Sequence, residues 1–150
     1  MTRRPHIRSP FLLLTLAVAA VILVAALPDG AADLRNLGIA QLENEKPAEA
    51  SDTFEELTRL APKDPLGWAN LAIARLRLQE TEAARAAITR ALEIDPGSPR
   101  LLAIRGDILQ WEGNQEGALA TYLEAGREAV DDSEVQYGLY RLASSMTGAQ

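Results

Sequence analysis

Few side chains in this chain could carry out chemistry. The only histidine, His6, lies in a basic N-terminal stretch, so neither a Ser-His-Asp triad nor a histidine zinc site can be built. The absence of cysteine excludes disulfides, thiolate metal sites and a cysteine nucleophile. Adjacent carboxylates occur at Glu55-Glu56 and Asp131-Asp132, where a solvated helix face and a helix cap explain them. We therefore expect no catalysis, no metal and no cofactor.

The glycines and the charges point away from nucleotides and nucleic acids. The ten glycines are scattered and form no phosphate-binding loop. Residues 1–28 contain Arg3, Arg4 and Arg8 and no acid, which leaves 12 basic against 21 acidic residues in the remainder, a net charge of −9. An acidic domain repels phosphate backbones. We expect a protein or peptide partner, no nucleic acid and no small-molecule substrate.

The element that organises the chain is a repeat of thirty-four residues between Leu34 and Val130. Small and large apolar residues recur in register, in the columns Gly38, Ala72, Gly106; Ala50, Ala84, Ala118; Leu34, Trp68, Leu102; Phe54, Ile88, Tyr122; and Leu57, Ala91, Ala125. Small residues let two helices cross closely, and large residues fill the space beside the crossing. A single hairpin cannot bury such a face, so the units must stack.

The spacing resembles the tetratricopeptide repeat (TPR), a helix-turn-helix unit of this length. The family's first-helix positions for Trp, Leu, Gly and Tyr hold Leu34, Leu37, Gly38 and Gln41 in one unit, Trp68, Leu71, Ala72 and Arg75 in the next, and Leu102, Arg105, Gly106 and Leu109 in the third. Pro62 and Pro96 close two units, whereas the third has Val130. The resemblance implies an all-α, right-handed solenoid over residues 28–150, with repeats 31–64, 65–98 and 99–132 and a capping helix over 133–146.

Start and stop signals place the helices. Proline at the first helical position, as in Asp64-Pro65 and Ser98-Pro99 with their capping side chains, marks helix starts. The predicted helices are 33–44, 47–60, 65–78, 81–94, 99–111, 115–129 and 134–145. Gly113-Asn114 suits an inter-helix turn better than Glu45-Lys46 or Gln79-Glu80 do.

The N-terminal segment predicts export. Residues 1–10 form a basic leader, expected to be cytoplasmic, and residues 11–27 are seventeen uncharged residues, about 25 Å as a helix. This is near the short limit for a membrane span and long for a signal-peptide core. An uncleaved inner-membrane anchor with the repeats facing the periplasm, and a cleaved signal that leaves a secreted or periplasmic protein, both remain open.

The candidate site is the concave groove lined by the first helix of each unit. Apolar residues at its centre and arginines at its edges would bind a peptide or a partner helix. The predicted groove residues are Arg35, Ile39, Leu42, Asn70, Ile73, Leu76, Arg77, Arg100, Asp107 and Trp111. The alternative is that the terminal helix or the anchor folds back over them.

Some TPR proteins of the chaperone-adaptor kind hold a peptide's C-terminal carboxylate in a five-residue clamp. This sequence matches three positions, with Arg35, Asn70 and Arg100, but has Ile39 and Ile104 at the other two. The resemblance therefore implies only an incomplete clamp.

The architecture admits several roles. One apolar segment followed by a few TPR units is similar to accessory subunits of cytochrome c maturation in the bacterial envelope. It is also similar to the leading portion of larger exported proteins in which TPR units precede a β-propeller. The competing class is a fixed structural subunit of a membrane complex, with no exchangeable ligand.

Overall fold

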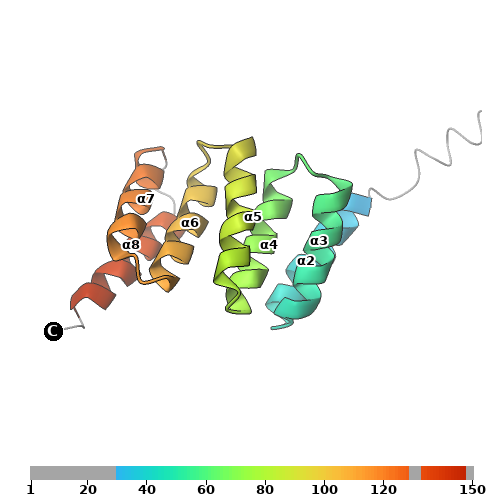
Figure 1. Cartoon of the computed structure of the whole chain (residues 1–150), viewed down its shortest axis with the longest axis horizontal. Coiled ribbons are helices and arrows are strands. Elements are labelled where there is room, and N and C mark those ends of the chain that lie inside the picture. Colours follow the sequence, from blue (N-terminus) through green and yellow to red (C-terminus); the bar gives the residue numbers. More distant parts are fainter. Residues whose placement is uncertain (1–29, 129–132, 148–150) are drawn as a thin grey trace, which may run out of the picture.

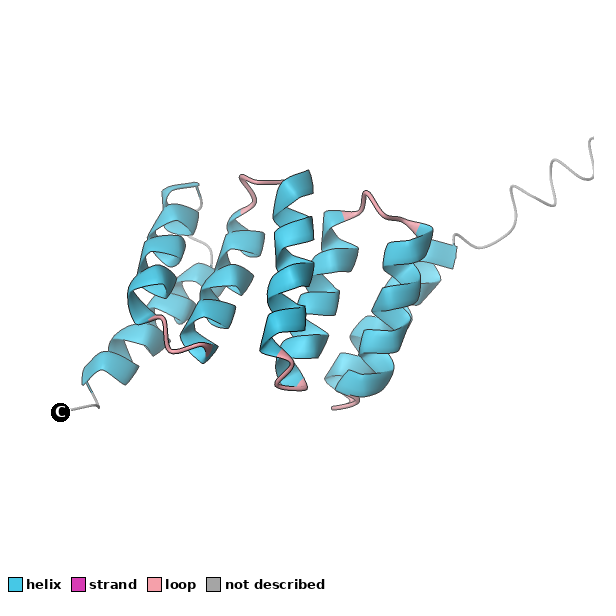
Figure 2. Cartoon of the chain, viewed as in Figure 1, coloured by secondary structure: helices cyan, strands magenta, loops and turns pink. Residues whose placement is uncertain are grey.

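The computed structural model describes residues 30–128 and 133–147, and over these ranges the chain is helical, with no strand. The helices are α2 (Gly30–Glu43), α3 (Pro47–Leu60), α4 (Pro65–Arg77), α5 (Thr81–Ile94), α6 (Pro99–Trp111), α7 (Gln115–Glu128) and α8 (Ser133–Thr147). They pack as three consecutive hairpins, followed by α8 alone (Figures 1 and 2). The predicted three helical hairpins and extra helix are confirmed.

The predicted leader 1–10, the apolar segment 11–27 and the cap at Asp131-Asp132 lie outside the described residues. Within the described ranges, no helix combines the length and the hydropathy that crossing a membrane requires. The predictions of an anchor or a signal peptide therefore stay predictions.

Helix starts follow the proline signals. Proline occupies the first turn of α3, α4 and α6, where the missing N–H costs nothing. Asp64 caps α4, because its Oδ1 accepts a hydrogen bond from the Leu66 N–H at 3.0 Å. Ser98 occupies the corresponding position before α6, but its side chain makes no capping hydrogen bond. The predicted N-cap position of Ser98 and the start of the helix are therefore confirmed, without a side-chain hydrogen bond.

The turns inside the three hairpins are equivalent. Glu45, Gln79 and Gly113 stand thirty-four residues apart, and their φ angles are 57°, 62° and 77°. This left-handed conformation is easy for glycine and strained for other residues. The better turn predicted at Gly113 thus has a physical basis, since the other two hairpins adopt the same conformation with residues that disfavour it.

The helices of a hairpin cross where glycine meets an aromatic ring. A Cβ built on Gly38 would lie 2.6 Å from the Phe54 ring, and one on Gly106 would lie 2.6 Å from the Tyr122 ring. Neither contact is tolerable for carbon atoms. The close crossings predicted from these columns are confirmed, and both rings are fully buried.

The stack has two unequal walls. The first helices α2, α4, α6 and α8, called here the inner wall, each contact the next one, whereas α3, α5 and α7, the outer wall, do not contact one another. Figure 1 shows the two sets lying at different depths. Because one wall is drawn together and the other is splayed, the stack curves with the inner wall on its concave side.

The buried core falls into two clusters. One runs through the first two hairpins into α6, and the other joins α6 and α7 to α8. Leu92 of α5 packs against both. The core therefore divides along α6, which contributes residues to both clusters.

Candidate partner-binding groove

The ten predicted groove residues all lie on α2, α4 and α6, helices of the inner wall, but differ in accessibility. Ile39, Arg77, Arg100 and Trp111 are exposed, with Trp111 exposed by 58%. Arg35, Ile73, Leu76 and Asp107 are half-buried, and Leu42 and Asn70 are buried.

The apolar stripe along the groove also holds the hairpins together. Leu42 belongs to the first core cluster, and Ile73 and Leu76 pack against that cluster. Burial between hairpins therefore accounts for part of the stripe. Trp111 is the large apolar residue among the predicted ones that packing leaves most exposed.

Two of the predicted arginines tie neighbouring hairpins to each other. Arg35 Nη2 donates to Asp64 Oδ2 at 2.6 Å, so the residue that caps α4 also anchors α2. Arg77 Nη1 donates to the Leu42 carbonyl oxygen at 2.7 Å, joining α4 to α2. These guanidinium groups are thus engaged within the protein before any ligand arrives.

Asp107 is at the centre of a polar network that fastens α8. It accepts a hydrogen bond at Oδ1 from the Tyr122 hydroxyl at 2.7 Å and pairs with the Arg141 guanidinium. Arg141 also donates to Gln110 Oε1, at 3.1 Å from Nε and 2.9 Å from Nη2. Burial, reinforced by the hydrogen bond to Asp107, raises the pKa of Tyr122 well above its ordinary value. Asp107 is therefore a structural tie.

The inner wall is hollowed between α4, α6 and α8. The depression measures about 230 Å³, with Ile73, Ala103 and Ile104 among the residues that line it. Tyr137, exposed by 63%, and Arg100 also line it. A second hollow of about 380 Å³ is lined by Gln110, Trp111 and Arg141. The groove thus offers apolar surface bordered by an aromatic ring and cationic groups.

Sequence reasoning missed the part of the groove that α8 supplies. Tyr137, Gly138 and Arg141 were not predicted, yet all three line the depression. The signal was present, because Tyr137 and Arg141 continue by thirty-four residues the groove positions Ala103 and Asp107. Arg141 of α8 bonds Asp107 and Gln110, and the alternative that the terminal helix folds over the apolar groove residues stays a prediction.

The described part of the chain holds no cluster of three or more histidine, cysteine or acidic residues that could bind a metal ion. The groove contains amide, carboxylate and guanidinium groups that are largely bonded to one another. Such a surface can bind another chain by contact and charge.

Comparisons with known proteins agree with this geometry. The sequence profile of the family described as "Tetratricopeptide repeat" matches residues 35–99 and 70–134, more than half of the chain. No curated protein sequence matches significantly.

Solved structures share the fold at low identity. The first TPR of Spaghetti (RPAP3) bound to the HSP90 peptide SRMEEVD is 20% identical, with a TM-score of 0.69, covering 78% of this chain and 93% of that one. The Sgt2 TPR domain from Aspergillus fumigatus is 19% identical, with a TM-score of 0.72, covering 81% and 82%. The Yersinia enterocolitica type III secretion chaperone SycD, in complex with a peptide of the translocator YopD, is 19% identical, with a TM-score of 0.66, covering 77% and 88%.

Proposed function

Because the chain belongs to the tetratricopeptide repeat family, we propose that it is a protein-interaction scaffold whose inner wall binds a partner peptide or helix. The observation that carries the proposal is the depression between α4, α6 and α8, which combines an apolar lining with an exposed Tyr137 and with Arg100. Two of the similar structures are peptide complexes, which supports the same mode of binding here. No catalytic activity is proposed.

The chemistry of the depression defines the ligand. Ile73, Ala103 and Ile104 would receive one apolar side chain, and Tyr137 would pack against it. Arg100 beside this pocket favours an acidic residue next to the apolar one. Trp111, further along α6, extends the contact surface toward the end of the groove.

Recognition does not depend on a C-terminal carboxylate. Of the residues at clamp positions, Arg35 is held by Asp64, Asn70 is buried, and Ile104 is both buried and apolar. We propose that the ligand is bound through its side chains, so an internal segment binds as well as a chain end. Peptides ending in a free acid or an amide should then have equal affinities.

The test is a selection of random displayed peptides on the purified protein, followed by affinity measurement with variants. Tyr137→Ala and Arg100→Ala should each weaken the selected peptides about tenfold, the worth of one good anchor. Asp52→Ala, an exposed change on the outer wall, is the control and should change nothing. Undiminished affinity in both inner-wall variants would refute the groove as the binding site.

The second candidate function, a fixed subunit of a larger assembly, is favoured by apolar side chains exposed at the C-terminal end. Leu119 and Leu123 of α7 and Tyr140 of α8 are exposed, with Tyr140 exposed by 71%. A permanent neighbour would cover such residues. A protein that is purified from cells only with stoichiometric companions, and that exchanges no peptide, would favour this role over the scaffold.

For location, we propose that residues 11–27 tether the scaffold to a bacterial inner membrane, with the repeats in the periplasm. The length and apolar character of the segment and the arginines before it support this. A role in envelope assembly such as cytochrome c maturation fits that setting. Mass spectrometry of the mature N-terminus in membrane and soluble fractions tests it, since a cleaved chain in the soluble fraction would contradict the tether.

A further inference from the structure

Another hollow opens between α5 of the outer wall and α6, and it shares no lining residue with the depression of the inner wall. This outer crevice lies between α5 and α6 and has a volume of about 600 Å³. Its lining includes the apolar side chains of Ile88, Leu92, Ile108 and Leu109. The corresponding place one unit earlier, between α3, α4 and α5, has a depression of about 290 Å³. The outer crevice is thus about twice as large as its internal counterpart.

The earlier junction shows what normally fills this space. Leu71 of α4 is only 2% exposed there and belongs to the first core cluster. Arg75 Nη2 bonds Glu55 Oε1 at 2.6 Å across the junction, and the Arg90 guanidinium lies 6.0 Å from the centre of the Trp68 ring. An apolar side chain and an ion pair close this junction together.

The later junction is built from different side chains. Thirty-four residues on, Arg105 replaces Leu71 and Leu109 replaces Arg75, so leucine and arginine have exchanged places. Arg105 is exposed and Leu109 is half-buried. A leucine that is buried in the first junction is therefore replaced in the second by an exposed arginine.

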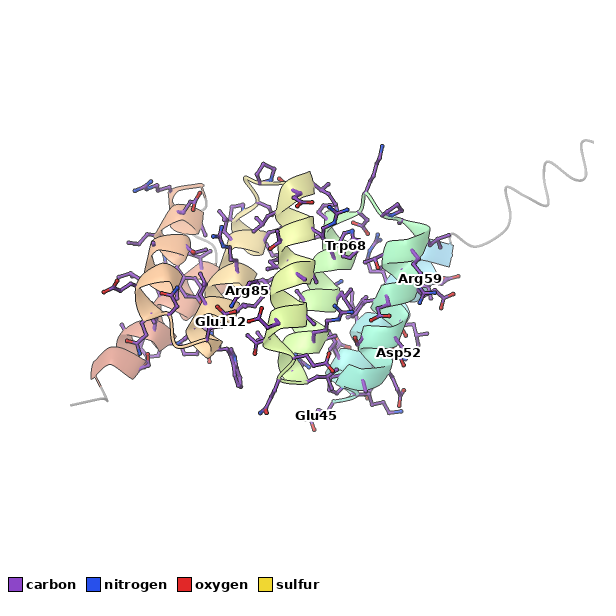
Figure 3. All side chains as sticks on the ribbon, in the orientation of Figure 1. Glu45, Asp52, Arg59, Trp68, Arg85 and Glu112 are labelled. Carbon is purple, nitrogen blue, oxygen red and sulfur yellow. The ribbon has the colours of Figure 1, made fainter. Side chains whose placement is uncertain are left out.

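Most of the charged side chains around the outer crevice are paired with one another. Arg85 Nη2 pairs with Glu112 Oε1 at 2.6 Å, and Figure 3 shows these two side chains at the junction of α5 and α6. Glu93 pairs with Arg90 at 2.5 Å. The side chain of Arg105 forms no ion pair or hydrogen bond with any residue that the structure describes. The crevice therefore presents apolar surface beside one arginine, Arg105, whose side chain is unpaired among the described residues.

We infer that the outer crevice is a second binding site, for a partner peptide that inserts a leucine-sized apolar side chain beside a carboxylate. The apolar side chain would replace the missing counterpart of Leu71 between Leu92 and Ile108. The carboxylate would pair with Arg105, as Glu55 pairs with Arg75 in the first junction. This site is separate from the inner groove and does not rest on it.

The probe is the short peptide acetyl-Ala-Leu-Glu-Ala-amide, titrated into the isotopically labelled protein and followed by NMR. The backbone amide resonances of the protein should shift on α5 and α6, around Leu92 and Leu109. The matched peptide with lysine in place of glutamate should bind about tenfold more weakly, because it loses a charge-assisted hydrogen bond.

Two substitutions of Arg105 separate the effect of filling the outer crevice from the effect of its charge. Arg105→Leu restores the leucine of the earlier unit, so it should abolish binding of the probe and raise the melting temperature by roughly 2–4 °C. Arg105→Glu leaves the crevice open and should reverse the preference, so that the lysine peptide binds better. Arg127→Leu, an exposed change on α7 that lines neither site, is the matched control and should leave the affinity of the probe unchanged.

Several results would overturn the inference. The inference is wrong if resonances of α5 and α6 do not shift at millimolar peptide, or if the two peptides bind with equal affinity. It is also wrong if Arg105→Leu binds the probe as the unmodified protein does. Loss of binding in Arg100→Leu instead would place the probe in the inner groove. Competition by a second copy of the chain, seen as concentration-dependent dimerisation that Arg105→Leu abolishes, would identify a different occupant.

Discussion

The first and third hairpins close their crossings with a glycine against an aromatic ring, whereas the middle hairpin uses an alanine against an isoleucine. Gly38 and Gly106 leave no room for a Cβ beside the rings that face them. In the middle, Ala72 and Ile88 occupy the same two columns and are equally buried. The comparison teaches that the repeat constrains the combined volume of the pair and leaves its composition free.

The largest effect is expected where the hairpins do not differ. Ala50, Ala84 and Ala118 are fully buried in all three, so leucine at any of them must displace neighbouring helices. Ala84→Leu should destabilise the protein by about 3 kcal/mol. Denaturant unfolding of the three leucine variants checks this. Melting of Ala84→Leu like the unmodified protein would show that the proposed stacking is wrong.

The pairing of volumes can be tested by exchanging it. Gly38→Ala should destabilise by about 2 kcal/mol, because the new Cβ meets the Phe54 ring. Adding Phe54→Ile reproduces the middle hairpin and should recover at least half of that loss, which is a coupling typical of residues in contact. If the double variant is instead as unstable as the sum of the two single changes, combined volume is not the constraint.

The aromatic residue at the crossing is Phe54 in the first hairpin and Tyr122 in the third, so the two rings differ by one hydroxyl group. This difference should make the stability of the third hairpin sensitive to alkaline pH. Since burial raises the pKa of Tyr122 in the folded state above the unfolded value of about 10, the unfolded state releases its proton first. Stability should therefore be fully present below pH 10 and fall above it, by up to about 1.4 kcal/mol per pH unit.

Tyr122→Phe should cost about 1 kcal/mol at neutral pH and flatten this dependence. The matched change Phe54→Tyr in the first hairpin provides the comparison, because the position equivalent to Asp107 in that hairpin, sixty-eight residues earlier, is Ile39 and cannot accept a hydrogen bond. Unfolding free energies between pH 8 and about 11 measure both. If the unfolding free energy of Tyr122→Phe falls equally steeply with pH, Tyr122 is not the cause of the pH dependence.

The smallest effects concern the turns, where the hairpins differ in sequence but agree in conformation. Gly113→Ala should destabilise by about 1 kcal/mol, since alanine is strained at positive φ. Glu45→Gly and Gln79→Gly should each stabilise by about 0.5 kcal/mol, the relief of strain being partly offset by the entropy of glycine. Thermal unfolding of the three variants should show this opposite sign.

The fold could be predicted because its determinants are local and repeated. Proline at helix starts and small residues at crossings occur in every unit. Gly38 and Gly106 meet rings that are only sixteen residues further along the chain. Helix α2 starts at Gly30, three residues before the predicted start at Asp33, and it includes Ala31 and Ala32, which favour helix. The bonding of Ser98 depends on a rotamer, which no sequence pattern specifies.

The groove was predicted less well because its surface depends on contacts between units. Arg35 and Asp64 are twenty-nine residues apart, and nothing in the sequence pairs them. Leu42 and Asn70 fall at sequence positions that are expected to face the groove, but packing within the stack buries them. Tyr137 and Arg141 could have been found by extending the register into the last half-unit.

The enclosure of Tyr122 ties α8 to the hairpin before it. A Cβ on Gly138 of α8 would collide with the same edge of the ring that Gly106 approaches, so detaching α8 would hydrate an aromatic side chain buried in the third hairpin. Amide protons of α6, α7 and α8 should therefore exchange with solvent together, as one cooperative block that opens before the first two hairpins do. Half of a repeat thereby governs how readily the C-terminal portion of the molecule comes apart.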